Sequence, residues 1–176
     1  MKLSLFKFKK HGPHLFLQPA IAVIYIAFIL FFLSLVDDGS KILWAIGSGA
    51  LSSSCYIVFV TPKSPIANSK RIIGGYFVGI IIGLLMHVFL TKMYNLTPYI
   101  GHFHTSHIFW ISAAITVGIS LIAMVILGVE HPPAVGISLV LVLHLGEYTT
   151  LLMIFISAVI LAFIHWLLKD WLVNLI

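Results

Sequence analysis

The sequence predicts an all-α polytopic membrane protein, and three observations lead to this fold class. Hydrophobic residues make up 61% of the chain and charged residues only 9%, whereas about a quarter of the residues of a soluble domain are charged. The mean hydropathy is +1.14. The apolar residues form about six runs, and most of them reach the ~20 residues that a membrane-spanning helix needs. The chain is therefore expected to form a single helical bundle without a separate soluble domain.

The expected elements follow one another with short connections. Residues 1–16 form a basic N-terminus that contains four lysines. The first apolar run, 17–36, is too long for the apolar core of a signal peptide and ends without a small-residue cleavage pattern, so we expect it to be an uncleaved span. The remaining runs complete one transmembrane domain, 17–176, and are expected at 42–60, 72–91, 108–127, 134–148 and 151–168.

The second and fifth segments are each interrupted or too short for a regular membrane-spanning helix. Segment 42–60 is interrupted by glycines and by three consecutive serines, and segment 134–148 is short and follows two prolines. The chain therefore resembles two three-segment repeats, each with a broken or short middle helix. An odd number of segments makes such repeats inverted, and paired interrupted helices are typical of transporter binding sites. If the two defective segments re-enter the membrane instead of crossing it, four full crossings remain.

The distribution of lysine and arginine predicts the orientation. With six crossings, only Lys41 and Lys92 fall on one side, and the other eight of the ten basic residues fall on the opposite side. Because cytoplasmic loops carry the excess of these residues, both termini are expected in the cytoplasm. We expect an integral protein of a bacterial inner membrane with the lipid bilayer as its partner. The net charge of +5 then concerns orientation, and no nucleic-acid partner is expected.

Glu130-His131-Pro132-Pro133 separates two apolar runs. Two consecutive prolines are excluded from a continuous helix, because each lacks an N–H and disfavours helical geometry in the residue before it. Proline suits the first turn of a new helix. The stretch therefore predicts a helix end, a sharp turn and a fresh helix start. Irregular backbone at membrane depth persists where protein or a water-filled cavity surrounds it, so this turn is a candidate functional site.

The new helix start is expected to bind a small anion near the membrane midplane, at a cavity where the N-termini of the two middle helices meet. Its free N–H groups and dipole are worth up to ~2 kcal/mol to a partly buried anion, and His131 adds a donor or a charge. A purely structural interpretation, a capped helix end with a rigid turn, remains open. The expected ligand-binding residues are His131, Pro132, Pro133, Ala134 and Gly136, with Ser52, Ser53 and Ser54 as cavity lining and Lys63 and Arg71 from a loop on the same side.

Glu130 has three interpretations. An ionised carboxylate would repel an anion unless Lys63 or Arg71 neutralises it. Burial could instead keep it protonated, which would make it a proton carrier for coupled transport. It could also be an interfacial carboxylate at a helix end.

Gly75, Gly79 and Gly83 recur every four residues on one face of the third span. Glycine in the middle of a span indicates close contact with another helix. This contact is expected to be structural, and it could join copies in a homo-oligomer.

His102, His104 and His107 lie in one short loop that could ligate Zn, Cu or Ni. No nearby Cys, Asp or Glu completes a ligand set, and a solvated loop is the simpler interpretation. The single cysteine, Cys55, excludes an intrachain disulfide and a Cys-based zinc site. No cofactor is expected. Enzyme motifs such as the P-loop, G-x-S-x-G and H-E-x-x-H do not occur, so no enzymatic activity is expected.

His131-Pro132-Pro133-Ala134 resembles the signature of the HPP family of small integral membrane proteins. Residues 62–67, followed by two glycines at 74–75, are similar to that family's P-x-S-P-x-A…GG segment. The resemblance extends from about Trp44 to the C-terminus. It departs at Val135-Gly136-Ile137, where the family has small residues of the G-A-T type. Because nitrite transport is attributed to some members, the resemblance implies a transporter or channel for nitrite or a similar oxyanion. The alternatives are a non-transporting membrane scaffold and a metal-sensing module that uses the histidine loop.

Overall fold

The computed structural model describes residues 12–35, 41–96, 105–143 and 148–176. Within these ranges the chain is all-α, with six α-helices, one 3-10 turn and no strand. Five helices are long and apolar enough to cross a membrane, which confirms the predicted fold class. The elements are α2 (His14–Ser34), α3 (Lys41–Val60), η1 (Pro65–Ala67), α4 (Ser69–Leu96), α5 (Thr105–Leu127), α6 (Pro132–Leu143) and α7 (Tyr148–Leu168).

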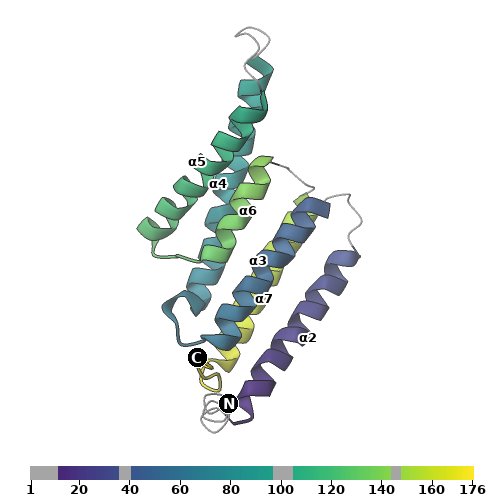
Figure 1. The fold of residues 1–176 in the computed structure, drawn as a ribbon, viewed down its shortest axis with the longest axis vertical. Helices are drawn as coiled ribbons and strands as arrows, with labels where there is room; N and C mark the ends of the chain where they lie inside the picture. Colours follow the sequence, from purple (N-terminus) through teal and green to yellow (C-terminus); the bar gives the residue numbers. More distant parts are fainter. Residues whose placement is uncertain (1–11, 36–40, 97–104, 144–147) are drawn as a thin grey trace, which may run out of the picture.

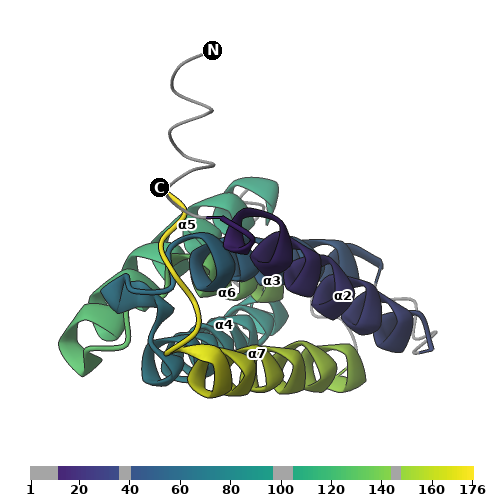
Figure 2. The same ribbon diagram turned by 90° about the horizontal axis from the view of Figure 1, so that it is seen from below.

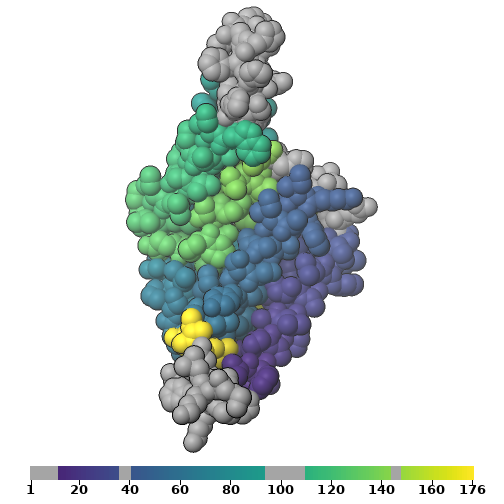
Figure 3. Space-filling model, viewed as in Figure 1, coloured from purple at the N-terminus to yellow at the C-terminus, as the bar shows by residue number. Residues whose placement is uncertain are grey.

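The helices form two layers (Figures 1 and 2). Helices α5, α6, α3 and α2 follow one another across the front layer of Figure 1, and α4 and α7 pack behind them. Helix α6 contacts α3, α4 and α5, so it lies inside the bundle, whereas α2 packs mainly on α3 at the edge. On the face drawn in Figure 3, α6 shows only a narrow strip between α5 and α3.

The start of α2, the connection from α3 to α4 and the C-terminal tail lie at one end of the bundle (Figure 1). The buried Gln18 amide holds them together, because its Nε2 donates to the carbonyls of Phe59 at 2.6 Å and Val173 at 3.0 Å. The Leu175 N–H also donates to the Val60 carbonyl at 2.9 Å. The predicted topology places these segments on one side of the membrane. That this side is cytoplasmic stays a prediction.

Helix α3 is continuous, so the prediction that the first middle helix is broken is wrong. Its serine hydroxyls donate back to carbonyls of their own helix, Ser48 to Ala45 at 2.9 Å and Ser53 to Gly49 at 3.0 Å. A hydroxyl satisfied in this way does not compete with the helix, so the polar cluster does not break it.

Helix α6 is short, as expected of the second middle helix. Its described residues are Pro132–Leu143, and Tyr148 belongs to α7. Twelve residues extend about 18 Å, well below the ~30 Å of a bilayer core. Such a helix is stable because its neighbours surround it, and its buried residues are Ala134, Val135, Ile137, Ser138, Val140, Leu141 and Val142.

The inverted relation of the two halves stays a prediction. The helix contacts are paired as that relation requires: α2 packs on α3 as α5 packs on α6, and α3 packs on α7 as α6 packs on α4.

The glycine face of α4 contacts α6 within the same chain. A Cβ added at Gly75 would lie 2.6 Å from the His131 Cβ, and one at Gly79 would lie 2.6 Å from the Ala134 carbonyl oxygen. At Gly83 the Leu141 Cβ would be 2.9 Å away. The predicted close helix contact is therefore present, but α6 occupies it. A homo-oligomer would have to use another face.

Candidate functional site

The turn between α5 and α6 is built by a glycine and two prolines. Gly128 has φ +63°, the left-handed conformation that ends many helices. The N–H of Gly128 donates to Val125 and that of Val129 to Met124, the hydrogen bonds of a Schellman motif. Helix α6 restarts at Pro132. The chain therefore turns within four residues and presents Glu130 and His131 to α3 and α4.

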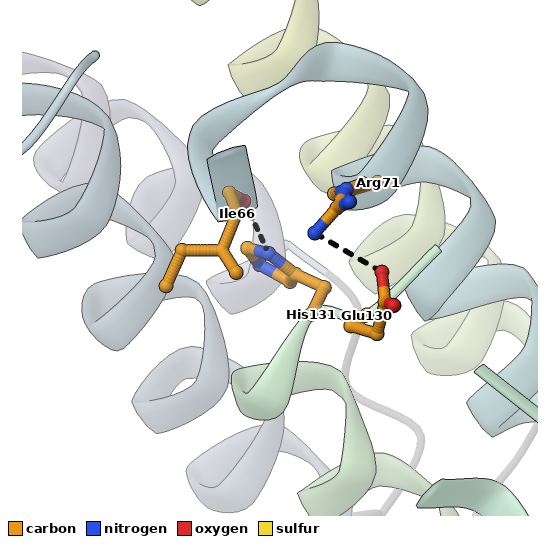
Figure 4. Close-up of polar contacts among 4 residues, drawn as sticks. All are labelled: Ile66, Arg71, Glu130 and His131. Atoms are coloured by element: carbon orange, nitrogen blue, oxygen red, sulfur yellow. Dashed lines mark hydrogen bonds and ion pairs between the residues drawn. The ribbon is translucent and has the colours of Figure 1, made fainter. Parts of the chain in front are cut away.

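His131 is buried, and both of its ring nitrogens have partners. Nδ1 lies 3.1 Å from the Ile66 carbonyl oxygen (Figure 4), and Nε2 lies 2.8 Å from the Ser54 Oγ. Because a carbonyl only accepts, Nδ1 carries the hydrogen. The Tyr76 hydroxyl lies 3.1 Å from the same Ser54 Oγ. Ser54, Tyr76 and His131 are each 0% exposed, so together they close the space between α3, α4 and α6.

The Glu130 carboxylate pairs with Arg71. Arg71 Nη1 lies 3.1 Å from Glu130 Oε2, and the two side chains are 31% and 33% exposed (Figure 4). Of the cations proposed to neutralise Glu130, Arg71 does so. Lys63 does not, because its ammonium donates to the Lys169 carbonyl at the end of α7. A half-buried ion pair therefore lies at the same turn as the buried histidine.

The imidazole of His131, which lies between the helices, is uncharged at neutral pH. Burial lowers its pKa from the ordinary value of 6.5 to about 4, and the hydrogen bond to the Ile66 carbonyl offsets part of this effect. In this structure His131 is therefore a hydrogen-bonding group, and it becomes a cation only if its surroundings change.

The structure brings together only some of the residues expected around an anion. Arg71, Ser54 and His131 converge at the turn. Ser52 and Ser53 are exposed on the outer side of α3.

At the start of α6, Pro132 is exposed and Pro133 is half-buried. Ala134 is buried against Gly79, and Gly136 is half-buried.

The start of α6 supplies fewer amide donors than expected. Pro132 and Pro133 have no N–H, and the Ala134 N–H already donates to the His131 carbonyl at 3.0 Å. The positive groups nearest the turn are therefore side chains, with Arg71 as the permanent cation.

The two middle helices do not meet at their N-termini, which corrects the predicted geometry. Helix α6 begins beside Ser54, six residues before the end of α3 at Val60. Six residues of helix correspond to about 9 Å. Ser54 thus lies about 9 Å from the end of α3 and about 5 Å from the middle of that helix. A site near the membrane midplane therefore stays a prediction.

The structure also contains an apolar groove away from this turn. A groove of about 490 Å³ runs between α2 and α3, and almost all of its lining is apolar. Ser52 and Cys55 line it together with residues of α2 such as Pro19 and Ile26. The space between α3 and α6, where a cavity was expected, is filled by the Ser54–His131 contact.

Sequence reasoning missed Tyr76 and the loop that precedes α4. His165 of α7 donates from Nε2 to the Pro62 carbonyl at 3.1 Å, so two buried histidines hold the loop that contains Pro62 and Ile66. The spacing P-x-S-P-x-A was visible, but nothing in it indicated that backbone carbonyls would be the contacts.

His102 and His104 lie outside the described residues, and the side chain of His107 does too. In the described part of the chain no three His, Cys, Asp or Glu side chains are grouped to hold a metal.

Comparison with known proteins places the chain among membrane proteins. The family model described as HPP, transmembrane region, matches residues 11–174. A transmembrane protein of Dictyostelium discoideum is 26% identical over 99 residues, which are 56% of this chain and 30% of that protein. The match thus spans less than a third of that relative's length. No solved structure matches the chain.

Proposed function

Because the chain belongs to the HPP transmembrane region family, we propose that it is a transporter or channel for a small anion such as nitrite, with Arg71 as the group that binds the anion and His131 as a neighbouring group that can carry a charge. One observation carries the proposal. In a bundle whose described spans are apolar, an ion pair and a buried histidine meet at the one turn where two prolines interrupt the chain. Ionisable groups in such a position are costly, and they usually mark a substrate path.

The Arg71–Glu130 pair has the chemistry of a gate. In this structure the Arg71 guanidinium is paired with the Glu130 carboxylate. A small oxyanion carries similar oxygen atoms and could bind the same N–H groups of Arg71. An incoming anion would exchange with Glu130 on Arg71, at the turn that also carries His131. The proposed function requires no covalent chemistry, and we propose that the protein is not an enzyme.

Anion uptake into proteoliposomes tests the proposal. Vesicles containing the purified protein would be assayed with nitrite, nitrate, formate and chloride, and protein-free vesicles would set the background. Arg71→Ala should lower uptake about tenfold or more, because it removes the cation that attracts the anion.

The matched control is Lys70→Ala, which removes the same charge from an exposed neighbour. It should change uptake less than about twofold, because an exposed cation is screened by solvent. Equal losses in both variants, or no uptake of any of the four anions above background, would overturn the proposal.

A further inference from the structure

Three buried hydroxyl and imidazole groups are connected in series beside the proposed anion site. They come from different parts of the fold: Tyr76 from α4, Ser54 from α3 and His131 from the turn before α6. The Ser54 Oγ is the central atom. It lies 3.1 Å from the Tyr76 hydroxyl, 2.8 Å from His131 Nε2 and 3.0 Å from the Ala50 carbonyl oxygen.

Ser54 has one hydrogen and two acceptors that compete for it. When His131 is neutral, Ser54 donates to Nε2 and Tyr76 donates to Ser54. When His131 is protonated, Nε2 donates to Ser54, and the Ser54 hydrogen turns to the Ala50 carbonyl. Nδ1 donates to Ile66 in both states. Both ring nitrogens and both hydroxyls keep a partner in either state, and no heavy atom has to move.

A buried donor or acceptor left without a partner costs about 1–3 kcal/mol. Neither protonation state of His131 carries this cost, because the Ser54 hydroxyl can donate or accept. Here the hydrogen bonds permit both states, and only the electrostatic surroundings choose between them.

Those surroundings can be named for each element around the ring. Helix α4 contributes Tyr76 and, one turn earlier, Arg71; helix α3 contributes Ser54 with Cys55 next to it; the turn contributes Glu130. Helix α6 and residues 110–129 contain no titratable side chain. Arg71 and Glu130 nearly cancel while they are paired, so nothing compensates a positive charge on the ring.

We propose that His131 takes up a proton from solution on Nε2 when the anion binds, while Ser54 changes from donor to acceptor, so that the protein moves the anion and the proton together as a neutral pair. This inference rests on the proposed function. A buried charge is costly unless it is paired, and a negative charge within a few ångströms favours the protonated ring. The anion supplies that charge, and the charges of the cargo sum to zero: one anion and one proton.

Flux driven by a pH gradient tests the inference. Proteoliposomes would be loaded at alkaline pH, diluted into acidic buffer with nitrate, and compared with vesicles that have no gradient. Wild-type uptake should rise several-fold with the gradient, and a potassium–valinomycin potential alone should not drive it. His131→Gln should bring the ratio of uptake with and without the gradient close to one, because an amide binds no proton at these pH values.

His165→Gln is the matched control. His165 is also buried and also donates to a carbonyl of the loop before α4, but it has no contact with Ser54 among the described interactions. This variant should keep the stimulation by the gradient.

A second measurement uses the wild type alone, in case the variants do not fold. Adding nitrate to the detergent-solubilised protein in a weakly buffered indicator dye should remove about one proton from solution for each anion bound.

The outcomes separate this inference from the proposed function. Anion uptake that follows the electrical potential, persistence of the gradient effect in His131→Gln, or anion binding without proton uptake would overturn the coupling but leave anion transport in place. An absence of any anion uptake by the wild type would overturn both.

Discussion

The two middle helices, α3 and α6, hold corresponding places in the two halves of the chain but differ in length and in what surrounds them. Helix α3 has 20 residues and is long enough to span a membrane, whereas α6 has 12. Helix α3 keeps an exposed outer face, with Tyr56 55% exposed beside the groove to α2. Helix α6 is enclosed by α3, α4 and α5. Length is therefore matched to surroundings: the helix that faces lipid is long, and the short one is covered by protein.

The two helices also show which residues interrupt a helix and which do not. Ser48 and Ser53 of α3 donate their hydroxyls to carbonyls of their own helix, so the helix continues through them. The prolines at the start of α6 cannot continue the preceding helix, because they lack the N–H groups that its hydrogen bonds need. The site forms where the long helix passes the start of the short one, at the contact between Ser54 and His131.

The largest expected effect comes from the close contact between α4 and α6. Gly79→Ala places a methyl group 2.6 Å from the Ala134 carbonyl oxygen, which is backbone and has to shift. We expect a loss of up to about 3 kcal/mol in the free energy of unfolding, the usual upper range for an overpacked contact. Unfolding in a denaturing detergent, followed by circular dichroism, measures it.

Gly49→Ala is the control on α3, because nothing lies within 4 Å of its added Cβ. It should be neutral or stabilise the protein by up to about 1 kcal/mol, since alanine favours helix over glycine. Equal destabilisation by both substitutions would mean that α3 is as closely packed at Gly49 as α4 is at Gly79.

Ser54→Ala should have the next largest effect. It removes the partner of both Tyr76 and His131, and the loss of one buried hydroxyl with unsatisfied neighbours costs about 2 kcal/mol. Ser53→Ala removes an exposed hydroxyl that contacts only its own helix and should cost less than about 0.5 kcal/mol. The same unfolding experiment compares the two variants. Similar losses of stability would mean that the hydrogen bonds of Ser54 to Tyr76 and His131 contribute no more than the exposed hydroxyl of Ser53.

The membrane spans could be predicted from the sequence because long apolar runs leave few alternatives in a bilayer. The turn at His131 could be predicted as well, since two prolines break any helix. The continuity of α3 could not be predicted, because it depends on whether each serine hydroxyl donates a hydrogen bond to its own helix or to a neighbouring helix. The pairing of Arg71 with Glu130 was one of two options, and only the placement of Lys63 beside the end of α7 decides between them.

The Tyr76 contact and the loop carbonyls at Pro62 and Ile66 could not be predicted for a different reason. They depend on how α4 and the loop before it lie against α6, and this is set by the glycines of α4. Glycine spacing indicates that two helices approach closely, but not which helix is the partner.

The contribution of His131 to the pH dependence of stability is expected to be smaller. The pKa of His131 is lowered from 6.5 to about 4, so between these values the unfolded state binds more protons than the folded state. Stability is therefore complete above pH 6.5 and decreases as the pH falls, by roughly 1.4 kcal/mol on reaching one unit below 6.5. His131→Gln should show a weaker decrease over the same range when unfolding is measured from pH 8 to 5.5. An identical pH profile in both proteins would assign the decrease to other groups.

The smallest effect on stability is expected at the ion pair beside the start of α6. Arg71 and Glu130 are about one-third exposed, and exposed pairs contribute about 0–1 kcal/mol. A double-mutant cycle with Arg71→Gln, Glu130→Gln and the double variant should therefore give a coupling free energy below about 1 kcal/mol in unfolding. The same variants should differ strongly in anion uptake, because the neutral glutamine at 71 leaves the anion without a cation. A coupling of several kcal/mol would mean that the pair holds the turn of α6 in place. Glu130 would then be a structural clamp, and exchange with an incoming anion would be too costly for a gate.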